Sequence, residues 1–423
     1  MQRREFIRWL AASGLMTGLI SPASAQVGRG ARIVVVGGSF AGATCAKYIR
    51  RWAPGAEVTL VEAASEFVSC PMSNRVISGA MSVRDLTRDY DALQRKHGIT
   101  VVHDRVTAID AQQRSVRLAR GPALPYDRLV LAPGIDVDYS AMAGLESEAA
   151  QQRVPHGWKA GQQTHQMRRM LGALPKGGVY AIHVPAAPYR CPPGPYERAC
   201  LVASSLQRTN PTAKVLVFDA NPQIVAKRGL FSDAFAGRYK NVIEYVPNAA
   251  FERMDVAGNT VDFDLQKGVR ADVWNPIPPQ HAGEIARSAG LANVDRRWCE
   301  VDFLTYESRV VPGIHVLGDA IASAPGMPKS AHLANQQAKV CAAAIAAMLA
   351  GRPVIDQPMF ANTCYSFISE GDAMHINTVY RYDAGSKTMV DVPGGGGVSR
   401  EASSEEAFMA VAWAFNILND TLA

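Results

Sequence analysis

Short apolar runs and helix-length amphipathic stretches alternate along the first part of the chain. Residues 32–36 (RIVVV) form an apolar, largely β-branched run, and residues 56–64 (AEVTLVEAA) contain a second one that ends at Glu62. Runs of this kind are typical of buried parallel strands. A glycine-containing turn and a helix-like stretch over 41–51 separate them. The pattern therefore predicts a βαβ unit of the dinucleotide-binding kind.

The same alternation returns later in the chain. Residues 177–220 predict a strand, a loop, a helix from near Pro195 to about Arg208, and a strand ending at Asp219. Two further apolar runs, over 126–135 and 313–322, each end in a tight turn. From about Arg352 the chain alternates short segments, passes through a glycine-rich stretch and ends in a predicted helix over 405–419. We expect an α/β protein with tandem Rossmann-type domains and a C-terminal α+β region.

The first turn carries most of a dinucleotide fingerprint. Gly37 and Gly42 match the outer glycines of G-x-G-x-x-G, whereas Ser39 replaces the middle one and Gly38 stands one place earlier. Glycines allow a tight turn, and the helix that follows presents its N-terminus to a pyrophosphate. Glu62 lies about 20 residues on, where an acidic side chain accepts hydrogen bonds from ribose hydroxyls. The alternative is a βα turn that holds no ligand.

The loop of the second unit has a different chemistry. It reads VPAAPYRCPPGPYER and holds five prolines in place of the usual glycines. Proline has no N–H group and fixes φ, so these residues remove the backbone donors that would hold a phosphate. We expect a second dinucleotide-binding fold without a nicotinamide nucleotide.

Composition and charge narrow the class further. A formal net charge of +6 over 423 residues gives no case for nucleic acid binding. No apolar run after residue 25 reaches the roughly 18 residues that span a bilayer. The seven cysteines show neither C-x-x-C nor zinc-ligand spacing, so we expect no metal site. C-x-x-C-H is also absent, so any c-type haem must belong to another subunit.

Residues 1–25 have the build of an export signal. A charged start with Arg3 and Arg4 leads to an apolar middle and a small-x-small end at Ala23–Ala25. The arginine pair resembles the twin-arginine signal, and an ordinary secretory signal is the alternative. We expect export to the periplasm by the twin-arginine route.

Several segments together identify a family. Ala132-Pro133-Gly134 and Gly318-Asp319 resemble the signatures of FAD-binding flavoproteins with two dinucleotide domains. From about Ala31 to the C-terminus, the chain resembles the flavoprotein subunit of flavocytochrome c sulfide dehydrogenase and the related flavoprotein of sulfur oxidation. The segments that carry this resemblance are VTLVEAASEFVSCPMSNRVISG, RCPPGPYERA, NPIPPQHAGEIARSAGL, GIHVLGDA, MPKSAHLANQQAKV and NTCYS.

The resemblance implies roles for particular residues. Cys70 matches a cysteine bonded covalently to FAD, and Cys191 and Cys364 match a redox-active disulfide beside the flavin ring. Glu197 matches a proposed acid/base. The remaining FAD-binding residues would be Gly37, Gly38, Ser39, Gly42, Glu62, Ala132, Gly134, Gly318, Asp319 and, at the flavin edge, Lys329.

Each role has a simpler alternative. Cys70 could be a packed or free thiol, and Cys191 with Cys364 a structural disulfide. Glu197 in a first helical turn is favourable against the helix dipole anyway, and Lys329 could be solvated. The variation before Met327-Pro328 and the serine at position 39 affect FAD contacts rather than the cysteines.

The resemblance implies a domain plan and an activity. Residues 27–143 and 283–351 would form a discontinuous FAD domain, 144–282 a second Rossmann-like domain and 352–423 an interface domain. The expected activity is oxidation of sulfide through the disulfide and FAD, with electrons passing to a c-type cytochrome subunit. The alternatives are a sulfide:quinone oxidoreductase and a thiol-disulfide maintenance partner of a sulfur-carrier protein. An NADH-linked reductase ranks last because of the proline loop.

Overall fold

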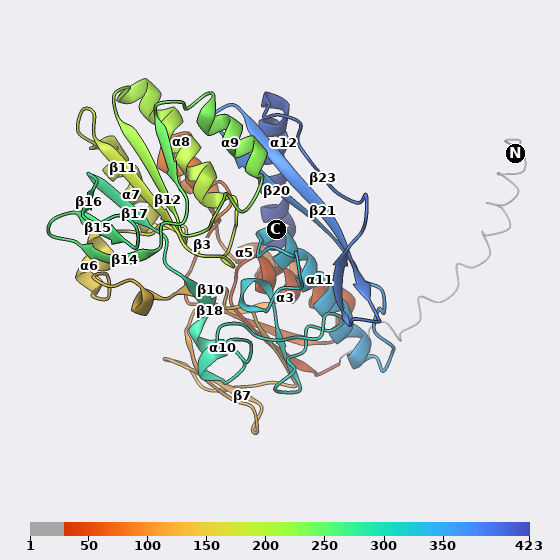
Figure 1. The fold of residues 1–423 in the computed structure, drawn as a ribbon. Helices are drawn as coiled ribbons and strands as arrows, with labels where there is room; N and C mark the ends of the chain where they lie inside the picture. Colours follow the sequence, from red (N-terminus) through yellow and green to blue (C-terminus); the bar gives the residue numbers. More distant parts are fainter. Residues whose placement is uncertain (1–28) are drawn as a thin grey trace, which may run out of the picture.

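The computed structural model describes residues 29–423 (Figure 1). The predicted export signal at residues 1–25 lies outside the described residues. Among the residues described, no helix is both long and apolar enough to cross a membrane.

The first sheet has five parallel strands and carries the predicted βαβ unit. Its outermost strand, β19, comes from a much later part of the chain and pairs with β9. Two helices, α3 (Phe40–Trp52) and α11 (Ala331–Leu349), pack against each other beside this sheet. In spatial order, the strands are β19 (Ile314–Val316), β9 (Arg128–Leu131), β1 (Arg32–Val36), β2 (Glu57–Val61) and β5 (Thr100–Val102).

The second sheet has four parallel strands and forms the part drawn in yellow and green at the left of Figure 1. Its strands, in spatial order, are β13 (Ile243–Val246), β12 (Lys214–Asp219), β11 (Val179–Val184) and β17 (Val273–Pro276). The accompanying helices are α6 (Glu148–Arg153), α7 (Gln162–Gly172), α8 (Gly194–Thr209) and α9 (Arg228–Ala236).

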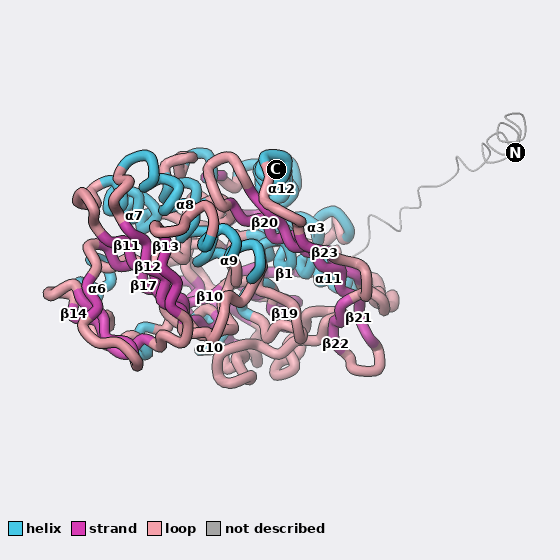
Figure 2. Tube along the Cα trace, turned by 45° about the horizontal axis from the view of Figure 1, so that its top comes forward, coloured by secondary structure: helices cyan, strands magenta, loops and turns pink. Residues whose placement is uncertain are grey.

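The C-terminal region is an antiparallel sheet with one long helix. Its strands are β20 (Met359–Phe367), β21 (Ala373–Asp383), β22 (Thr388–Asp391) and β23 (Gly397–Val398). The helix is α12 (Ser404–Leu422), which packs on β20 and β21. Figure 2 shows this sheet at the opposite side of the molecule from β11, β12 and β17. Helix α8 contacts both β12 and β20, which explains why it is buried on nearly every side.

Helix α12 runs to Leu422, beyond the Asn419 that we expected from the sequence. Lys47 of α3 explains the difference. Its buried ammonium donates hydrogen bonds to the backbone carbonyls of Asp420, at 2.9 Å, and Ala423, at 2.7 Å. Carbonyls at the C-terminus of a helix lack partners within the helix, so the lysine stabilises the last turn.

Short elements connect these three parts. They are the strands β3 (Phe67–Val68), β4 (Thr87–Arg88), β6 (Val106–Asp110), β7 (Ser115–Leu118), β8 (Leu124–Pro125), β10 (Ile135–Val137), β14 (Phe251–Asp255), β15 (Thr260–Phe263), β16 (Val269–Arg270) and β18 (Gln280–Ala282), the helices α4 (Ser73–Ser78), α5 (Asp91–His97) and α10 (Glu284–Ser288), and the 3-10 turns η1 (Arg84–Leu86), η2 (Tyr139–Ala141) and η3 (Gly318–Ala320). The predicted fold class, tandem Rossmann-type domains with a C-terminal α+β region, is confirmed.

Candidate active site

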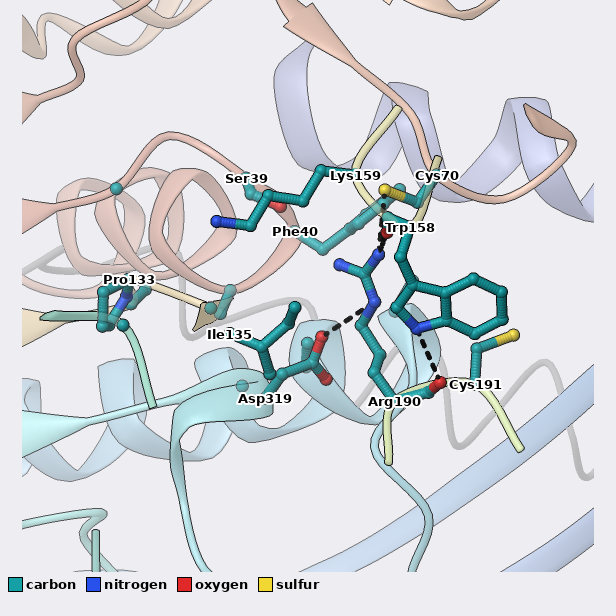
Figure 3. A pocket seen from close by; sticks show the side chains of 18 of the residues that line it. Ser39, Phe40, Cys70, Pro133, Ile135, Trp158, Lys159, Arg190, Cys191 and Asp319 are labelled. Atoms are coloured by element: carbon teal, nitrogen blue, oxygen red, sulfur yellow. Dashed lines mark hydrogen bonds and ion pairs between the residues drawn. The ribbon is translucent and has the colours of Figure 1, made fainter. Parts of the chain in front are cut away.

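One large cavity lies where the three parts meet. Its volume is about 890 Å³, which is at the upper end for cofactor pockets. The residues predicted from the sequence that line it are Gly37, Ser39, Glu62, Cys70, Ala132, Gly134, Cys191, Glu197, Gly318, Asp319 and Cys364. Gly38, Gly42 and Lys329 do not line it. Residues far apart in the chain therefore share one site (Figure 3).

The glycine turn between β1 and α3 is a tight cradle at one end of the cavity. Gly37 has φ +101°, and a Cβ there would lie 2.3 Å from the carbonyl oxygen of Ala132. A Cβ on Gly42 would lie 1.9 Å from the carbonyl oxygen of Gly37. Ser39 is the N-cap of α3, and its side chain makes no capping hydrogen bond. The N-terminus of α3 is therefore open towards the cavity, as a pyrophosphate site requires.

Glu62 lies at the end of β2 on the same side. Its Oε2 accepts a hydrogen bond from the Gly38 N–H at 2.7 Å, and its Oε1 accepts one from the Ala64 N–H at 2.9 Å. These contacts hold the carboxylate at the cavity wall, where its remaining lone pairs can accept from ribose hydroxyls. Gly38 is constrained in turn, because a Cβ there would lie 2.6 Å from the Tyr90 hydroxyl oxygen.

Cys70 faces the cavity between two N–H donors (Figure 3). Its sulfur lies 3.4 Å from the Ala160 backbone nitrogen and 3.5 Å from Nη2 of Arg190. The Arg190 Nε lies 3.9 Å from Oδ2 of Asp319. Burial raises the pKa of the Asp319 carboxyl, and the positive charges of Arg190 and Lys329 act against this shift.

Lys329 does not place its ammonium at the cavity, so the structure differs from the flavin-edge contact that we expected. Its Nζ donates to the Ile321 carbonyl and lies 3.8 Å from the centroid of the Trp298 ring. Burial lowers the pKa of Lys329 to about 8. The backbone carbonyl of Lys329 instead accepts a hydrogen bond from the Cys191 N–H at 3.0 Å, which fixes the cysteine loop.

Cys191 and Cys364 approach the cavity from different parts of the fold. Cys191 lies just before α8, with φ +54°, and Cys364 lies on β20. Both are free thiols in the structure. Surrounding protein atoms raise the pKa of the Cys191 thiol to about 12, and the charge of Glu197 adds to this shift. Burial also raises the pKa of Cys364, but the positive charge of Lys227 opposes it.

Glu197 lies in the first turn of α8 beside the two thiols. Its Oε1 accepts a hydrogen bond from the Phe367 N–H at 2.9 Å, and its Oε2 accepts one from Nδ2 of Asn74 at 2.7 Å. Burial raises the pKa of this carboxyl. A fixed carboxylate with a raised pKa is suited to accept a proton near neutral pH.

Two charged residues near the site were missed by sequence reasoning. Arg198 is only 2 % exposed, and its guanidinium donates to Asn74 Oδ1, Asn275 Oδ1 and the carbonyls of His156 and Gly157. Lys227, just before α9, is 6 % exposed. Arg198 lies within the RCPPGPYERA segment and Lys227 in none of the segments that carry the resemblance, and the contacts of both are visible only in the fold.

In the second parallel sheet, the acidic residue that ends β12 is already hydrogen-bonded within the protein. Asp219, at the end of β12, is fully buried. Its Oδ2 accepts hydrogen bonds from the hydroxyls of Tyr196, at 2.7 Å, and Tyr245, at 2.9 Å, while its Oδ1 accepts two from Asn221. The carboxylate is thus used within the protein. That this fold holds no nicotinamide nucleotide stays a prediction.

The site fits FAD. The glycine cradle, the oriented Glu62, Asp319 in the η3 turn and the N-terminus of α3 supply the contacts that an adenine dinucleotide needs. Cys70 lies in the same cavity as the two thiols. The four other cysteines, Cys45, Cys200, Cys299 and Cys341, are fully buried and do not line it.

Three family models match the chain. "Pyridine nucleotide-disulphide oxidoreductase" matches residues 31–170, "Sulfide dehydrogenase [flavocytochrome c] flavoprotein chain, central" matches 164–278, and "Flavocytochrome c sulphide dehydrogenase, flavin-binding" matches 356–422. The last of these supports FAD as the cofactor.

Individual proteins to which the chain is similar also carry names of sulfide-oxidising enzymes. The sulfide dehydrogenase [flavocytochrome c] flavoprotein chain of Chlorobaculum thiosulfatiphilum is 58% identical over 45 residues, which cover 11% of this chain and 94% of that sequence. The mitochondrial sulfide:quinone oxidoreductase of Mus musculus is 23% identical over 305 residues, covering 68% of this chain and 65%, less than two thirds, of the mouse protein. The solved sulfide:quinone oxidoreductase of Aquifex aeolicus has the same fold, with a TM-score of 0.76 and 19% identity over 92% of this chain and 91% of that one. Over residues 164–278 and 356–422 in particular, the chain is therefore similar to the flavoproteins of sulfide oxidation.

Proposed function

We propose that the protein oxidises hydrosulfide through Cys191 and Cys364, holds FAD as the electron acceptor and passes electrons to a c-type cytochrome subunit. The observation that carries this proposal is that Cys191, Cys364 and Glu197 line the same cavity as the dinucleotide cradle. We also propose that the protein acts in the periplasm after twin-arginine export, because the first 25 residues have the build of that signal.

In this proposal the resting enzyme has a Cys191–Cys364 disulfide. Hydrosulfide attacks one sulfur, the disulfide bond breaks, and its electron pair leaves on the other cysteine as a thiolate. Glu197, held by Asn74 and the Phe367 N–H, is placed to accept the proton of the new persulfide. Bound FAD supplies the two-electron acceptor and the one-electron steps towards haem.

A quinone acceptor is the second candidate. Relatives named sulfide:quinone oxidoreductase match much of this chain. On the first half of α12, the side chains of Phe408 and Met409 are 77% and 55% exposed. Half of the apolar residues of α12 are instead buried, among them Ala410, Ala414 and Leu418. Packing in the interface region is therefore the better-supported use of this helix.

An anaerobic titration tests the proposed function and separates the acceptors. We expect one equivalent of sulfide to bleach the flavin absorbance of the purified protein, and added cytochrome c to restore it. Faster reoxidation by decylubiquinone, together with co-sedimentation with liposomes, would favour the quinone enzyme. Activity that requires a sulfur-carrier protein, with no sulfide–cytochrome reaction, would favour the maintenance role. If sulfide leaves the flavin unbleached, the proposed function is wrong.

Replacing Cys70 by serine should convert covalent FAD into extractable FAD. The sulfur of Cys70 faces the cavity, 3.4 Å from the Ala160 backbone nitrogen and 3.5 Å from Nη2 of Arg190, so it is accessible to a cofactor bound there. We expect acid precipitation to leave FAD with the wild-type polypeptide and to release it from the Cys70→Ser variant. Mass spectrometry of the Cys70 peptide checks the added mass.

The Cys191→Ser variant is the matched control, because it removes a thiol from the same cavity and should keep its FAD in the acid pellet. Release of FAD from wild-type protein by acid would contradict the covalent bond.

A further inference from the structure

Lys227 is a buried cation without an ion-pair partner. Its side chain is buried, and its Nζ donates a hydrogen bond to Ser366 Oγ at 2.6 Å. Within residues 29–423, no carboxylate lies within 4.0 Å of this ammonium. Its backbone is left-handed, with φ +51°, which is unfavourable for a side chain larger than glycine. A buried ammonium is costly unless a negative charge faces it.

Strand β20 places Cys364 two residues from Ser366, the hydrogen-bond partner of this cation. Asn362, Cys364 and Ser366 alternate along the strand and therefore share one face. Asn362 Nδ2 donates to Cys364 Sγ at 3.4 Å, and Asn362 Oδ1 accepts from the Ser330 hydroxyl at 2.7 Å, which fixes the amide. Ser366, on the other side of Cys364, holds Lys227. Cys364 therefore stands on this face between Asn362, which donates to its sulfur, and Ser366, which holds the ammonium.

We propose that Lys227 is a positioning residue whose ammonium stabilises the thiolate of Cys364. The role of Lys227 in the sulfide reaction rests on the proposed function. When the sulfur of hydrosulfide bonds to Cys191 Sγ, the Cys191–Cys364 bond breaks and its electron pair stays on Cys364. In this step the hydrogen of hydrosulfide stays on the persulfide, and Glu197 can accept it only afterwards, so the single negative charge moves from the substrate to Cys364. Lys227 faces the charge that this step creates.

The surrounding charges agree with this assignment. Lys227 faces Cys364, Glu197, Cys191 and Glu406, and Cys364 is the partner that raises the pKa of Lys227 most. Glu406 is already engaged with His375 Nδ1 at 2.7 Å, and Glu197 with Asn74 and Phe367.

The charges of Lys227 and Cys364 act on each other: a Cys364 thiolate favours the charged form of Lys227, and the Lys227 ammonium favours the thiolate. Burial lowers the pKa of Lys227 to about 8, so its charge is present below that pH and is lost as the pH rises through it. The negative charge of Glu197 opposes a thiolate at Cys364, and the charge of Lys227 offsets it.

Thiol alkylation of the reduced holoprotein tests the assignment without sulfide turnover. Iodoacetamide labelling is followed at each cysteine by peptide mass spectrometry between pH 5 and 9. Because loss of a neighbouring charge shifts a thiol pKa by about one unit or more, Lys227→Met should slow labelling of Cys364 about tenfold at pH 7. Lys227→Arg should recover most of the rate.

Lys240→Met is the matched control, because Lys240 lies in the same part of the chain and is exposed. It should leave labelling of Cys364 unchanged. Circular dichroism and flavin content report whether Lys227→Met folds. The wild-type profile provides a test that needs no variant, since the apparent pKa of Cys364 should lie below that of Cys191.

A wild-type Cys364 that titrates above Cys191 would overturn the assignment. So would a Lys227→Met protein that folds and labels at the wild-type rate. Failure of sulfide to bleach the flavin would overturn the proposed function alone, because alkylation reports the thiolate directly.

Discussion

Replacing Cys191 by serine is expected to abolish reduction of the flavin by sulfide while leaving FAD bound. The thiol lines the cavity directly before α8, whereas the cradle that would hold FAD is built from β1, β2 and α3. Serine is similar in size but cannot form a disulfide or a persulfide. Groups that act as one catalytic unit lose nearly all activity when one is removed. We therefore expect the rate of bleaching to fall by about 10³-fold or more, as measured by stopped-flow absorbance.

The double variant Cys191→Ser/Cys364→Ser should be no slower than either single variant, because each already removes the disulfide. Cys200→Ala is the matched control, since Cys200 lies in the same helix region, is fully buried and does not line the cavity. It should bleach at close to the wild-type rate. Bleaching of Cys191→Ser within about tenfold of wild type would show that the pair is not the point of sulfide entry.

The local parts of the site could be predicted from the sequence because they lie within one βαβ unit. The glycines of the first turn and Glu62 follow a fixed spacing, and the same packing that requires Gly37 and Gly42 brings Glu62 to the Gly38 N–H. Spacing could not indicate that Cys191 and Cys364 line the same cavity. That expectation came from a family resemblance, and its physical basis is the packing of α8 between β12 and β20.

Other parts of the site depend on contacts that no local pattern encodes. Cys299 stands in a polar stretch of sequence, yet it is fully buried because its strand segment pairs with Ile321, beside the Gly318–Asp319 turn. Lys329 was expected at the flavin edge, but its ammonium lies 3.8 Å from the centroid of the Trp298 ring and the residue does not line the cavity. Buried charges such as Lys227 are rare, and no sequence pattern marks this one.

Replacing Arg198 by alanine should destabilise the protein more than any surface change. The guanidinium joins α4, the segment at His156 and Gly157, and β17, through hydrogen bonds of 2.7 to 2.9 Å to Asn74, His156, Gly157 and Asn275. It also lies over the Trp158 ring, 5.0 Å from the centroid. Removing it leaves several buried acceptors without donors, and each such loss is costly. An unsatisfied buried acceptor costs about 1–3 kcal/mol, so we expect the free energy of unfolding to fall by several kcal/mol.

Urea unfolding followed by tryptophan fluorescence measures this loss, and Trp158 reports the site itself. Arg208→Ala is the matched control. Arg208 lies on the same helix, is about half exposed and pairs with Glu370 at 3.2 Å. An exposed ion pair contributes about 0–1 kcal/mol, so this variant should unfold near the wild-type midpoint. Arg198→Lys keeps the positive charge but loses the planar set of N–H donors of the guanidinium. Its urea midpoint should therefore lie between those of Arg198→Ala and Arg208→Ala. If Arg198→Ala unfolds at the midpoint of Arg208→Ala, the guanidinium does not hold the two Rossmann-type units together around the cavity.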